Sequence, residues 1–248
     1  MRLVLMMTAY AGVIAVQAPG GPPMELPAAA TVQLSKSLEA AAAHPTHVWR
    51  DTPPVNEDGS VNVYIEIPLG DRRKWEFDMR RQARAIDRVV PQALGGYPVN
   101  YGFVPQTVSY DGDPFDALVL GSPLRGAEVV RGRIVGLMLM EDEKGPDSKV
   151  VITLRGRTGG STGIPDADRQ RIGDYFERYK RHEPGKFSKV HGWGSAADGL
   201  SYVRVTHAFF SDCREPAGDS CRVKRAAQLR SWPTSCLGDP DPACPRSP

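Results

Sequence analysis

The chain has 248 residues, 41% of them apolar and 24% charged, which is typical of a soluble globular protein with one domain and tails. Lysines and arginines number 31 against 29 acidic residues, a net charge of +2 that provides no global field for nucleic acid or an anionic membrane. A local basic stretch between residues 72 and 88 is typical of a solvated surface.

The first 18 residues are typical of a secretion signal. Arg2 precedes an apolar run, Leu3–Val16, that is too short to span a bilayer comfortably, and Val16–Ala18 places small residues where a signal peptidase cleaves. An uncleaved membrane anchor is the alternative. We expect cleavage before Pro19 and an exported protein, periplasmic or extracellular, with no membrane contact after the leader is removed.

Short alternating segments follow an extension, residues 19–60, in which Thr31–Ala43 predicts one helix. The expected strands are Val61–Ile67, Lys74–Asp78, Ala85–Val90, Phe115–Leu120, Arg133–Met140 and Val150–Leu154. Short strands separated by Gly and Pro turns predict a barrel or a sandwich.

One amphipathic helix is expected over Asp166–Arg181, because Pro165 precedes it and Pro184 lies just beyond its end. Its apolar face consists of Ile172, Tyr175, Phe176 and Tyr179. Beyond Trp193 the pattern weakens, and the chain continues from about residue 211 as a Cys- and Pro-rich tail.

All four cysteines lie in that tail, with seven residues between the members of each pair. In an oxidising compartment this symmetry favours two local disulfides, Cys213–Cys221 and Cys236–Cys244, although the sequence allows three connectivities. Zinc sites usually space their thiols two to four residues apart, which disfavours a zinc site here.

The segment Asp111–Asp116 contains three aspartates in six positions, and a second acidic cluster spans residues 142–147. Oxygen ligands of this kind suit hard divalent cations, and the five scattered histidines form no zinc motif. A plain turn accounts for Asp111–Pro114 but leaves Asp116 unexplained, and the EF-hand calcium pattern is not met.

Carboxylates and cationic or phenolic groups also occur in the same segments. Glu66 and Glu76 lie in alternating runs, where each faces either solvent or a cavity. The accompanying donors are Lys74, Arg88, Tyr97, Tyr101, Lys149, Tyr179 and Lys180. Carboxylates that bind Mg²⁺ together with Lys, Arg and Tyr donors favour phosphoryl-transfer chemistry.

Gly159–Gly163 matches the G-x-S-x-G elbow of serine hydrolases, and His191 follows it. That elbow runs from a strand directly into a helix, whereas here Pro165 follows two residues after the motif. A flexible loop is the better interpretation.

From about Val61 to Trp193 the chain resembles the family I soluble inorganic pyrophosphatases. The anchor is the signature D-G-D-P-x-D, met in full by Asp111–Asp116. Seven further segments match in the right order: Ile65–Pro68, Lys74–Glu76, Asp87–Arg88, Tyr97–Gly102, Met140–Lys149, Phe176–Lys180 and Lys189–Trp193.

The resemblance implies a mainly β (α+β) fold, a five-stranded OB-like barrel with flanking helices. It implies hydrolysis of pyrophosphate with several Mg²⁺ ions per site, Mn²⁺ or Zn²⁺ being substitutes, and a homo-oligomer. We divide the chain into a signal peptide (1–18), an extension (19–60), a catalytic domain (61–210) and the tail (211–248). The leader and the tail are additions that cytoplasmic members lack, and a tail that covers a family interface would change the oligomer.

The resemblance also implies a role for each candidate site residue. The ligands of the two metals that flank the attacking water are Asp111, Asp116 and Asp147. The ligands of further Mg²⁺ ions are Asp142, Glu66 and Glu76. The phosphate-binding residues are Lys74, Arg88, Tyr101, Lys149, Tyr179 and Lys180. Asp113 is the general base, and Tyr97 supports the metal ligands.

Two other functions are compatible with the same residues. One is a related Mg²⁺-dependent phosphohydrolase that acts on a short polyphosphate or a nucleotide. The other is an exported, metal-stabilised binding module on the same barrel without catalysis. The silent module is disfavoured by four residues that a purely structural metal does not need: Asp113, Lys74, Arg88 and Tyr179.

Overall fold

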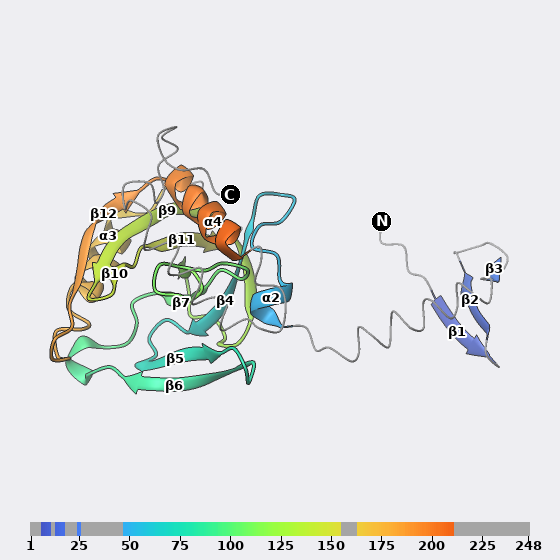
Figure 1. Ribbon diagram of the computed structural model, residues 1–248, viewed down its shortest axis with the longest axis horizontal. Helices are drawn as coiled ribbons and strands as arrows, with labels where there is room; N and C mark the ends of the chain where they lie inside the picture. The colour runs from blue at the N-terminus through green and yellow to red at the C-terminus, as the bar shows by residue number, and fades with distance from the viewer. Residues whose placement is uncertain (1–5, 11–12, 18–23, 26–46, 155–162, 211–248) are drawn as a thin grey trace. The chain divides into compact units, whose positions relative to one another are not determined.

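The computed structural model describes residues 6–10, 13–17, 24–25, 47–154 and 163–210 (Figure 1). The chain divides into two units, Met1–Thr46 and His47–Pro248. The predicted helix over Thr31–Ala43, most of the Gly159–Gly163 loop and the four tail cysteines lie outside the described residues.

Within the first unit, three strands form an antiparallel sheet: β1 (Met6–Tyr10), β2 (Val13–Gln17) and β3 (Met24–Glu25). The described parts of the predicted leader's apolar run therefore lie in two paired antiparallel strands. Removal of the leader stays a prediction. Within the described ranges, no helix combines the length and the apolar character needed to cross a lipid bilayer.

The second unit is built on a closed ring of five strands (Figure 1). In ring order they are β4 (Val61–Ile67), β7 (Asn100–Phe103), β8 (Asp116–Leu120), β11 (Lys149–Leu154) and β9 (Val129–Asp142). Only β8 and β11 run parallel within this ring; its other pairs are antiparallel. The ring confirms the expected five-stranded OB-like barrel.

Strand β4 closes the ring because it pairs with two neighbours in turn. Val61–Tyr64 pairs with β9, and the later half of β4 pairs with β7. The register shifts between Ile65 and Ile67, which leaves Glu66 without a partner in β7. A bulge of this kind re-aims a side chain, and it explains why a glutamate lies among core residues.

Further strands extend this framework. Strands β10 (Gly145–Pro146) and β12 (Ser188–Gly194) both pair with β9. Strands β5 (Arg73–Asp78) and β6 (Ala83–Val89) form a separate hairpin, drawn below the barrel in Figure 1. Strands β7 and β12 were not predicted as strands, because β7 is short and β12 contains two glycines and a bulge.

Helices cover the outside of the barrel. They are α2 (Val48–Asp51), the 3₁₀ turn η1 (Gln92–Leu94), α3 (Asp166–Phe176) and α4 (Ala196–Phe210). Helix α4 was not predicted, since its sequence contains Gly199 and several β-branched residues. It forms because Val203, Phe209 and Phe210 are buried on one side of it.

The apolar face predicted for α3 is confirmed: Ile172, Tyr175, Phe176 and Tyr179 are all buried. The helix itself ends at Phe176, five residues before the predicted Arg181. Tight turns follow, in which Arg178 N donates to Tyr175 O. Tyr179 and Lys180 therefore project from irregular backbone beyond the helix rather than from its last turn.

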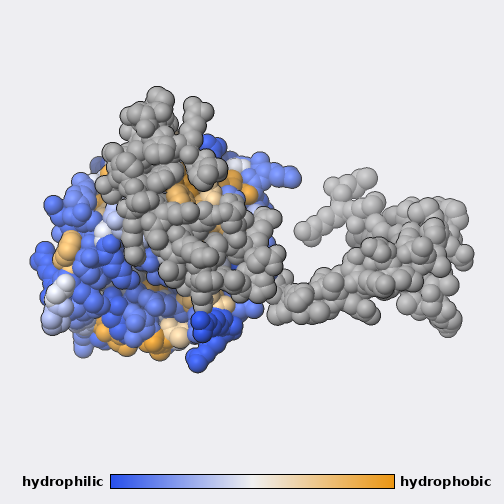
Figure 2. All heavy atoms as spheres, viewed as in Figure 1, coloured by the Kyte–Doolittle hydropathy of each residue, from blue (hydrophilic) through white to orange (hydrophobic). Residues whose placement is uncertain are grey.

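On the face that Figure 2 shows, the described residues of the second unit are mainly hydrophilic, with smaller apolar areas between them. Among the described residues, the large apolar side chains that remain exposed are Ile86, Val89, Val129 and Phe187. The buried charged side chains Glu66, Asp142 and Lys180 line one cavity, and Lys149 lies beneath it.

Candidate active site

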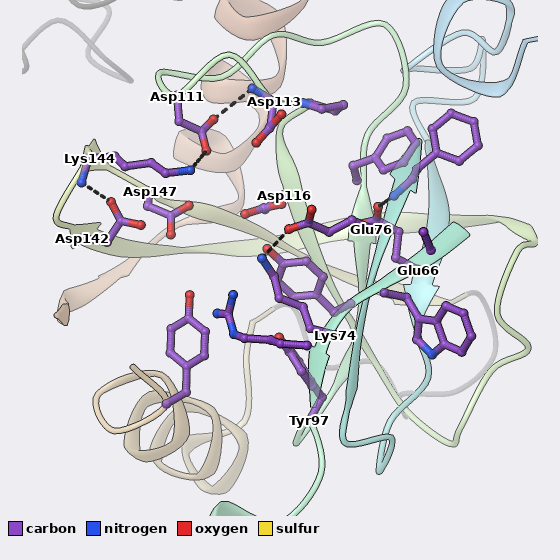
Figure 3. A pocket seen from close by; sticks show the side chains of 18 of the residues that line it. Glu66, Lys74, Glu76, Tyr97, Asp111, Asp113, Asp116, Asp142, Lys144 and Asp147 are labelled. Carbon is purple, nitrogen blue, oxygen red and sulfur yellow. Dashed lines mark hydrogen bonds and ion pairs between the residues drawn. The ribbon is translucent and has the colours of Figure 1, made fainter. Parts of the chain in front are cut away.

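A cavity of about 600 Å³ opens between the β5–β6 hairpin, the loop before β8, the β9–β10 turn and the turns after α3 (Figure 3). The predicted site residues that line it are Glu66, Lys74, Glu76, Arg88, Tyr97, Tyr101, Asp111, Asp113, Asp116, Asp142, Asp147, Tyr179 and Lys180. Lys149, the remaining predicted residue, lies directly beneath the cavity floor and is 1% exposed. Segments more than 100 residues apart thus form one site.

The aspartate loop is a tight turn that directs its carboxylates to the same cavity. Asp113 N donates to Asp111 Oδ1 at 3.0 Å, and Ser109 N donates to Asp113 O at 2.6 Å. Gly112 adopts a φ of 94°, a left-handed conformation that glycine reaches without strain. Asp116 follows as the first residue of β8. Its side chain faces those of Asp111 and Asp113 across the cavity in Figure 3.

Lys149 joins two of the predicted metal ligands. Its Nζ donates to Asp116 Oδ2 at 2.6 Å and to Asp147 Oδ1 at 2.7 Å. Burial opposes the charge of this ammonium group, but the two carboxylates raise the pKa of Lys149 above its usual value. The lysine is therefore a fixed cation in the floor of the site.

Burial, with crowding by neighbouring carboxylates, raises the pKa of three of the acidic side chains at the cavity. Burial raises the pKa of Asp147 to about 7, because the repulsion of Asp116 adds to it and the attraction of Lys149 only partly opposes it. Burial and the neighbouring Asp113 raise the pKa of Asp111 to about 6. Burial also raises the pKa of Glu66 well above its ordinary value, although Phe77 N donates to it at 2.7 Å. Such a cluster favours a bound cation.

Lys180 plays the corresponding part at the acidic cluster of residues 142–147. Its Nζ donates to Asp142 Oδ2 at 2.6 Å and lies 3.0 Å from Glu143 Oε2. Although burial opposes the charge, the ammonium of Lys180 holds the pKa of Asp142 below its ordinary range. The second acidic cluster is thus also neutralised by a lysine.

The β5–β6 hairpin supplies two further cations. Lys74 Nζ lies 2.5 Å from Glu76 Oε1 and 3.4 Å from Asp87 Oδ2. Arg88 contacts the same Asp87 at 2.7 Å, and its Nε lies 3.3 Å from Glu183 Oε1. Because Lys74 and Arg88 pair across the hairpin, both side chains reach the cavity from one face.

Aromatic rings form the wall between these groups. The ring of Tyr97 lies 5.7 Å from that of Tyr101 and 5.3 Å from that of Tyr175. Lys149 Nζ lies 5.5 Å from the centre of the Tyr101 ring. Burial and the neighbouring Asp116 raise the pKa of Tyr101 well above its ordinary value, so that its hydroxyl remains a hydrogen-bond donor.

The donor set fits a hard divalent ion, because the acidic side chains around the cavity offer oxygen ligands only. In the described part of the chain, however, no three His, Cys, Asp or Glu side chains converge closely enough to hold a metal ion. Lysines lie between the carboxylates instead: Lys149 between Asp116 and Asp147, and Lys180 beside Asp142. The oxygen donors therefore fit a hard divalent ion by their chemistry, and in this conformation ammonium groups are their counterions.

Sequence reasoning missed several charged residues at this cavity: Arg80, Glu143, Lys144, Glu183 and Lys186. Lys144 lies inside the matched segment Met140–Lys149, and that position already indicates that it lies near the site. Glu183 and Lys186 belong to the turns after α3, and only the tertiary structure brings that segment to Arg88.

Comparison with known proteins identifies the family of the chain. The family model described as inorganic pyrophosphatase matches residues 63–211. The inorganic pyrophosphatase of Saccharolobus solfataricus is 40% identical over 152 residues, which cover 58% of this chain and 88% of the relative. That of Thermus thermophilus is 42% identical over 153 residues, or 58% and 87% of the two chains.

Solved structures agree as well. The crystal structure of the Thermus thermophilus inorganic pyrophosphatase superposes with a TM-score of 0.62 at 39% identity, covering 66% of this chain and 98% of that one. The inorganic pyrophosphatase of Coxiella burnetii gives a TM-score of 0.60 at 34% identity, covering 64% and 100%. With its barrel, its aspartate loop and its matched segments, the chain belongs to the family I soluble inorganic pyrophosphatases.

Proposed function

We propose that this chain hydrolyses inorganic pyrophosphate to two orthophosphates in the cavity described above, with Mg²⁺ as its cofactor. Membership of this family identifies the reaction and makes the chain an inorganic diphosphatase, a hydrolase of phosphoric anhydrides. One observation supports it most: carboxylates and cations alternate around a single cavity. An acidic cluster alone would repel a polyphosphate, and a basic cluster alone would not hold a metal ion.

The metal ligands follow from the arrangement of the acids. Asp111, Asp116 and Asp147 would hold two ions, and Asp142, Glu66 and Glu76 would hold the ions that accompany the substrate. When bound, Mg²⁺ lowers the pKa of water and withdraws charge from phosphoryl oxygens. Mn²⁺ or Zn²⁺ are the proposed substitutes. Tyr97, which is 1% exposed and lines the same cavity, is the proposed supporting residue of these metal ligands.

Asp113 is the proposed general base. Its carboxylate belongs to the aspartate loop, beside Asp111, and its backbone N–H is engaged by that neighbour. The turn therefore fixes the backbone while the side chain faces the cavity, as Figure 3 shows. A carboxylate held in this way accepts the proton of the attacking water as the new P–O bond forms.

The cationic and phenolic side chains are the proposed phosphate-binding residues. Lys74 and Arg88 approach from the hairpin, and Tyr179 and Lys180 approach from the turns after α3. Tyr101 and Lys149 contribute from the barrel floor. Positive charges placed around both phosphates stabilise the charge that develops on the leaving phosphate when the bridging P–O bond breaks.

The test is phosphate release from pyrophosphate by the chain from Pro19 onward, with Mg²⁺ and with EDTA. Tripolyphosphate, ATP and p-nitrophenyl phosphate serve as competing substrates. We expect fast release from pyrophosphate that requires Mg²⁺. Activity mainly on the other substrates would indicate the related phosphohydrolase instead, and no activity from folded, Mg²⁺-bound protein would indicate the binding module.

We also propose that the protein is exported, on the strength of Arg2, the apolar run Leu3–Val16 and the small residues before Pro19. Expression of the full chain in a bacterium, fractionation, and intact-mass analysis test this. Mature protein that begins at Pro19 in the periplasm or medium is expected, and full-length protein in the cytoplasm would contradict it.

Export into an oxidising compartment would allow the disulfides Cys213–Cys221 and Cys236–Cys244 to form. Peptide mapping without reductant identifies the connectivity. A homo-oligomer remains our expectation from the family, and light scattering measures it. The same measurement on a chain truncated after residue 210 separates an effect of the tail from a property of the barrel.

A further inference from the structure

We propose that Lys144 is a built-in counterion of Asp111, which competes with Mg²⁺ for that carboxylate and weakens Mg²⁺ binding in the absence of substrate. This inference rests on the proposed function, because it takes Asp111 to be a metal ligand. It assigns a role to a lysine that lies outside the predicted phosphate-binding set.

The contact between the two groups is direct. Lys144 Nζ lies 3.8 Å from Asp111 Oδ2, where the side chains are 57% and 26% exposed. Figure 3 shows the lysine extending from the turn beside Asp142 across the cavity mouth to the aspartate loop. The ammonium group therefore lies beside Asp111 Oδ2, an oxygen that a divalent ion would need as a ligand.

The backbone on both sides of Lys144 holds it at this place. Its own N–H donates to Asp142 Oδ1 at 2.7 Å. The next residue, Gly145, has a φ of 123°, and a Cβ there would lie 2.4 Å from the ring of Tyr110. Only glycine allows the turn to pack this closely against Tyr110, the residue before Asp111. The turn thus fixes the start of the lysine side chain next to the aspartate loop.

Lys144 differs from Lys149 and Lys180, the other lysines that contact aspartates among the predicted metal ligands. Lys149 and Lys180 are buried and donate short hydrogen bonds, whereas Lys144 is half exposed and forms a longer ion pair. An exposed ion pair contributes little stability, so a divalent ion displaces it at little cost. The freed ammonium then lies at the mouth of the cavity, where a phosphate oxygen is its natural partner.

The experiment measures Mg²⁺ affinity directly, by isothermal titration calorimetry on metal-free protein without pyrophosphate. We compare the wild-type chain with Lys144→Met, which keeps the length of the side chain and removes its charge. Loss of a unit charge beside a divalent ion at a water-exposed site corresponds to about 3- to 10-fold tighter Mg²⁺ binding. Lys144→Arg keeps the charge and should bind Mg²⁺ like the wild type, within about twofold.

Lys186→Met is the matched control, because it removes the same charge from the same cavity but its partner, Glu183, is not a predicted metal ligand. It should change the affinity by less than about twofold, consistent with a charge not paired to a ligand. Thermal unfolding in EDTA verifies that each variant is folded.

The outcomes separate this inference from the proposed function. Tighter Mg²⁺ binding by Lys144→Met alone supports the counterion role. Equal or weaker binding by that variant, or an equal gain in Lys186→Met, overturns the role and leaves the metal site intact. A wild-type chain that binds no Mg²⁺ at all would overturn the proposed metal site itself.

Discussion

Lys149 Nζ lies 2.6 Å from Asp116 Oδ2, although the two residues are 33 positions apart in the sequence. Each is the first residue of its strand, β11 and β8, and the parallel pairing of those strands begins one residue later, with Val150 opposite Ala117. The strand register alone therefore brings this cation to this carboxylate. A shift by one residue would move either side chain to the opposite face of the sheet.

Replacement of Lys149 by Met should destabilise the metal-free protein by about 3–5 kcal/mol, because it leaves Asp116 and Asp147 without their counterion in a buried setting. Added Mg²⁺ should restore more stability to this variant than it adds to the wild type, since the ion replaces the lost charge. Urea unfolding with EDTA and with Mg²⁺ measures both effects. Lys189→Met, an exposed lysine on β12, should change stability by less than about 0.5 kcal/mol.

Asp113→Asn should lower kcat by about two or more powers of ten, the usual scale for loss of a general base. The turn should survive, because Asp113 contributes its backbone N–H to Asp111. Steady-state kinetics with pyrophosphate and Mg²⁺ measure the loss, and circular dichroism verifies the fold. Asp174→Asn, on the exposed side of α3, should keep full turnover. A folded Asp113→Asn enzyme with nearly full activity would refute the assignment.

Gly145→Ala should be more damaging than Gly185→Ala, although both glycines have a positive φ. A Cβ at residue 185 meets nothing within 4 Å, so only the backbone strain of about 1 kcal/mol remains. At residue 145 the new Cβ meets the Tyr110 ring, and overpacking adds about 1–3 kcal/mol. Chemical unfolding compares the two variants. An equal loss of stability in both variants would show that the turn around residue 145 rearranges to accommodate the new Cβ.

The stability of the second unit should fall below pH 6.5 because of His47. Burial lowers the pKa of this histidine, whose Nε2 lies 2.9 Å from Met79 O and whose Nδ1 faces Arg50 N. A folded-state pKa below the unfolded value of 6.5 means that the unfolded chain takes up the proton first. The stabilising contribution is therefore complete above pH 6.5 and is lost as the pH falls through the folded-state pKa.

The variant His47→Asn isolates that effect, because asparagine retains an acceptor at this helix N-cap and does not titrate. Urea unfolding at pH 7.5 and pH 5.5 should show a smaller loss of stability in the variant than in the wild type. An identical loss in both proteins would exclude His47 as the cause. His182→Gln, at an exposed position, should behave like the wild type.

Sequence patterns alone were enough to predict most of the residues that meet at the cavity, although not Lys144, Glu183 or Lys186. The spacing within Asp111–Asp116 and the other matched segments identified the acids, the cations and the tyrosines, and every one of them lies at the cavity or directly beneath it. Local alternation was enough for strands such as Val61–Ile67, whose bounds agree exactly with β4. These features depend on neighbours within a few residues, which a sequence displays directly.

How those residues meet depends on the three-dimensional packing of the chain. The bulge that turns Glu66 into the cavity, the early end of α3 before Tyr179 and the helix α4 depend on packing between distant segments. The contacts of Lys149 with Asp116 and of Lys144 with Asp111 depend on strand register and on one close-packed turn. Spacing along the chain specifies which chemical groups are present, whereas the partner of each charge follows from long-range pairing and packing, because a carboxylate accepts any cation that the fold places beside it.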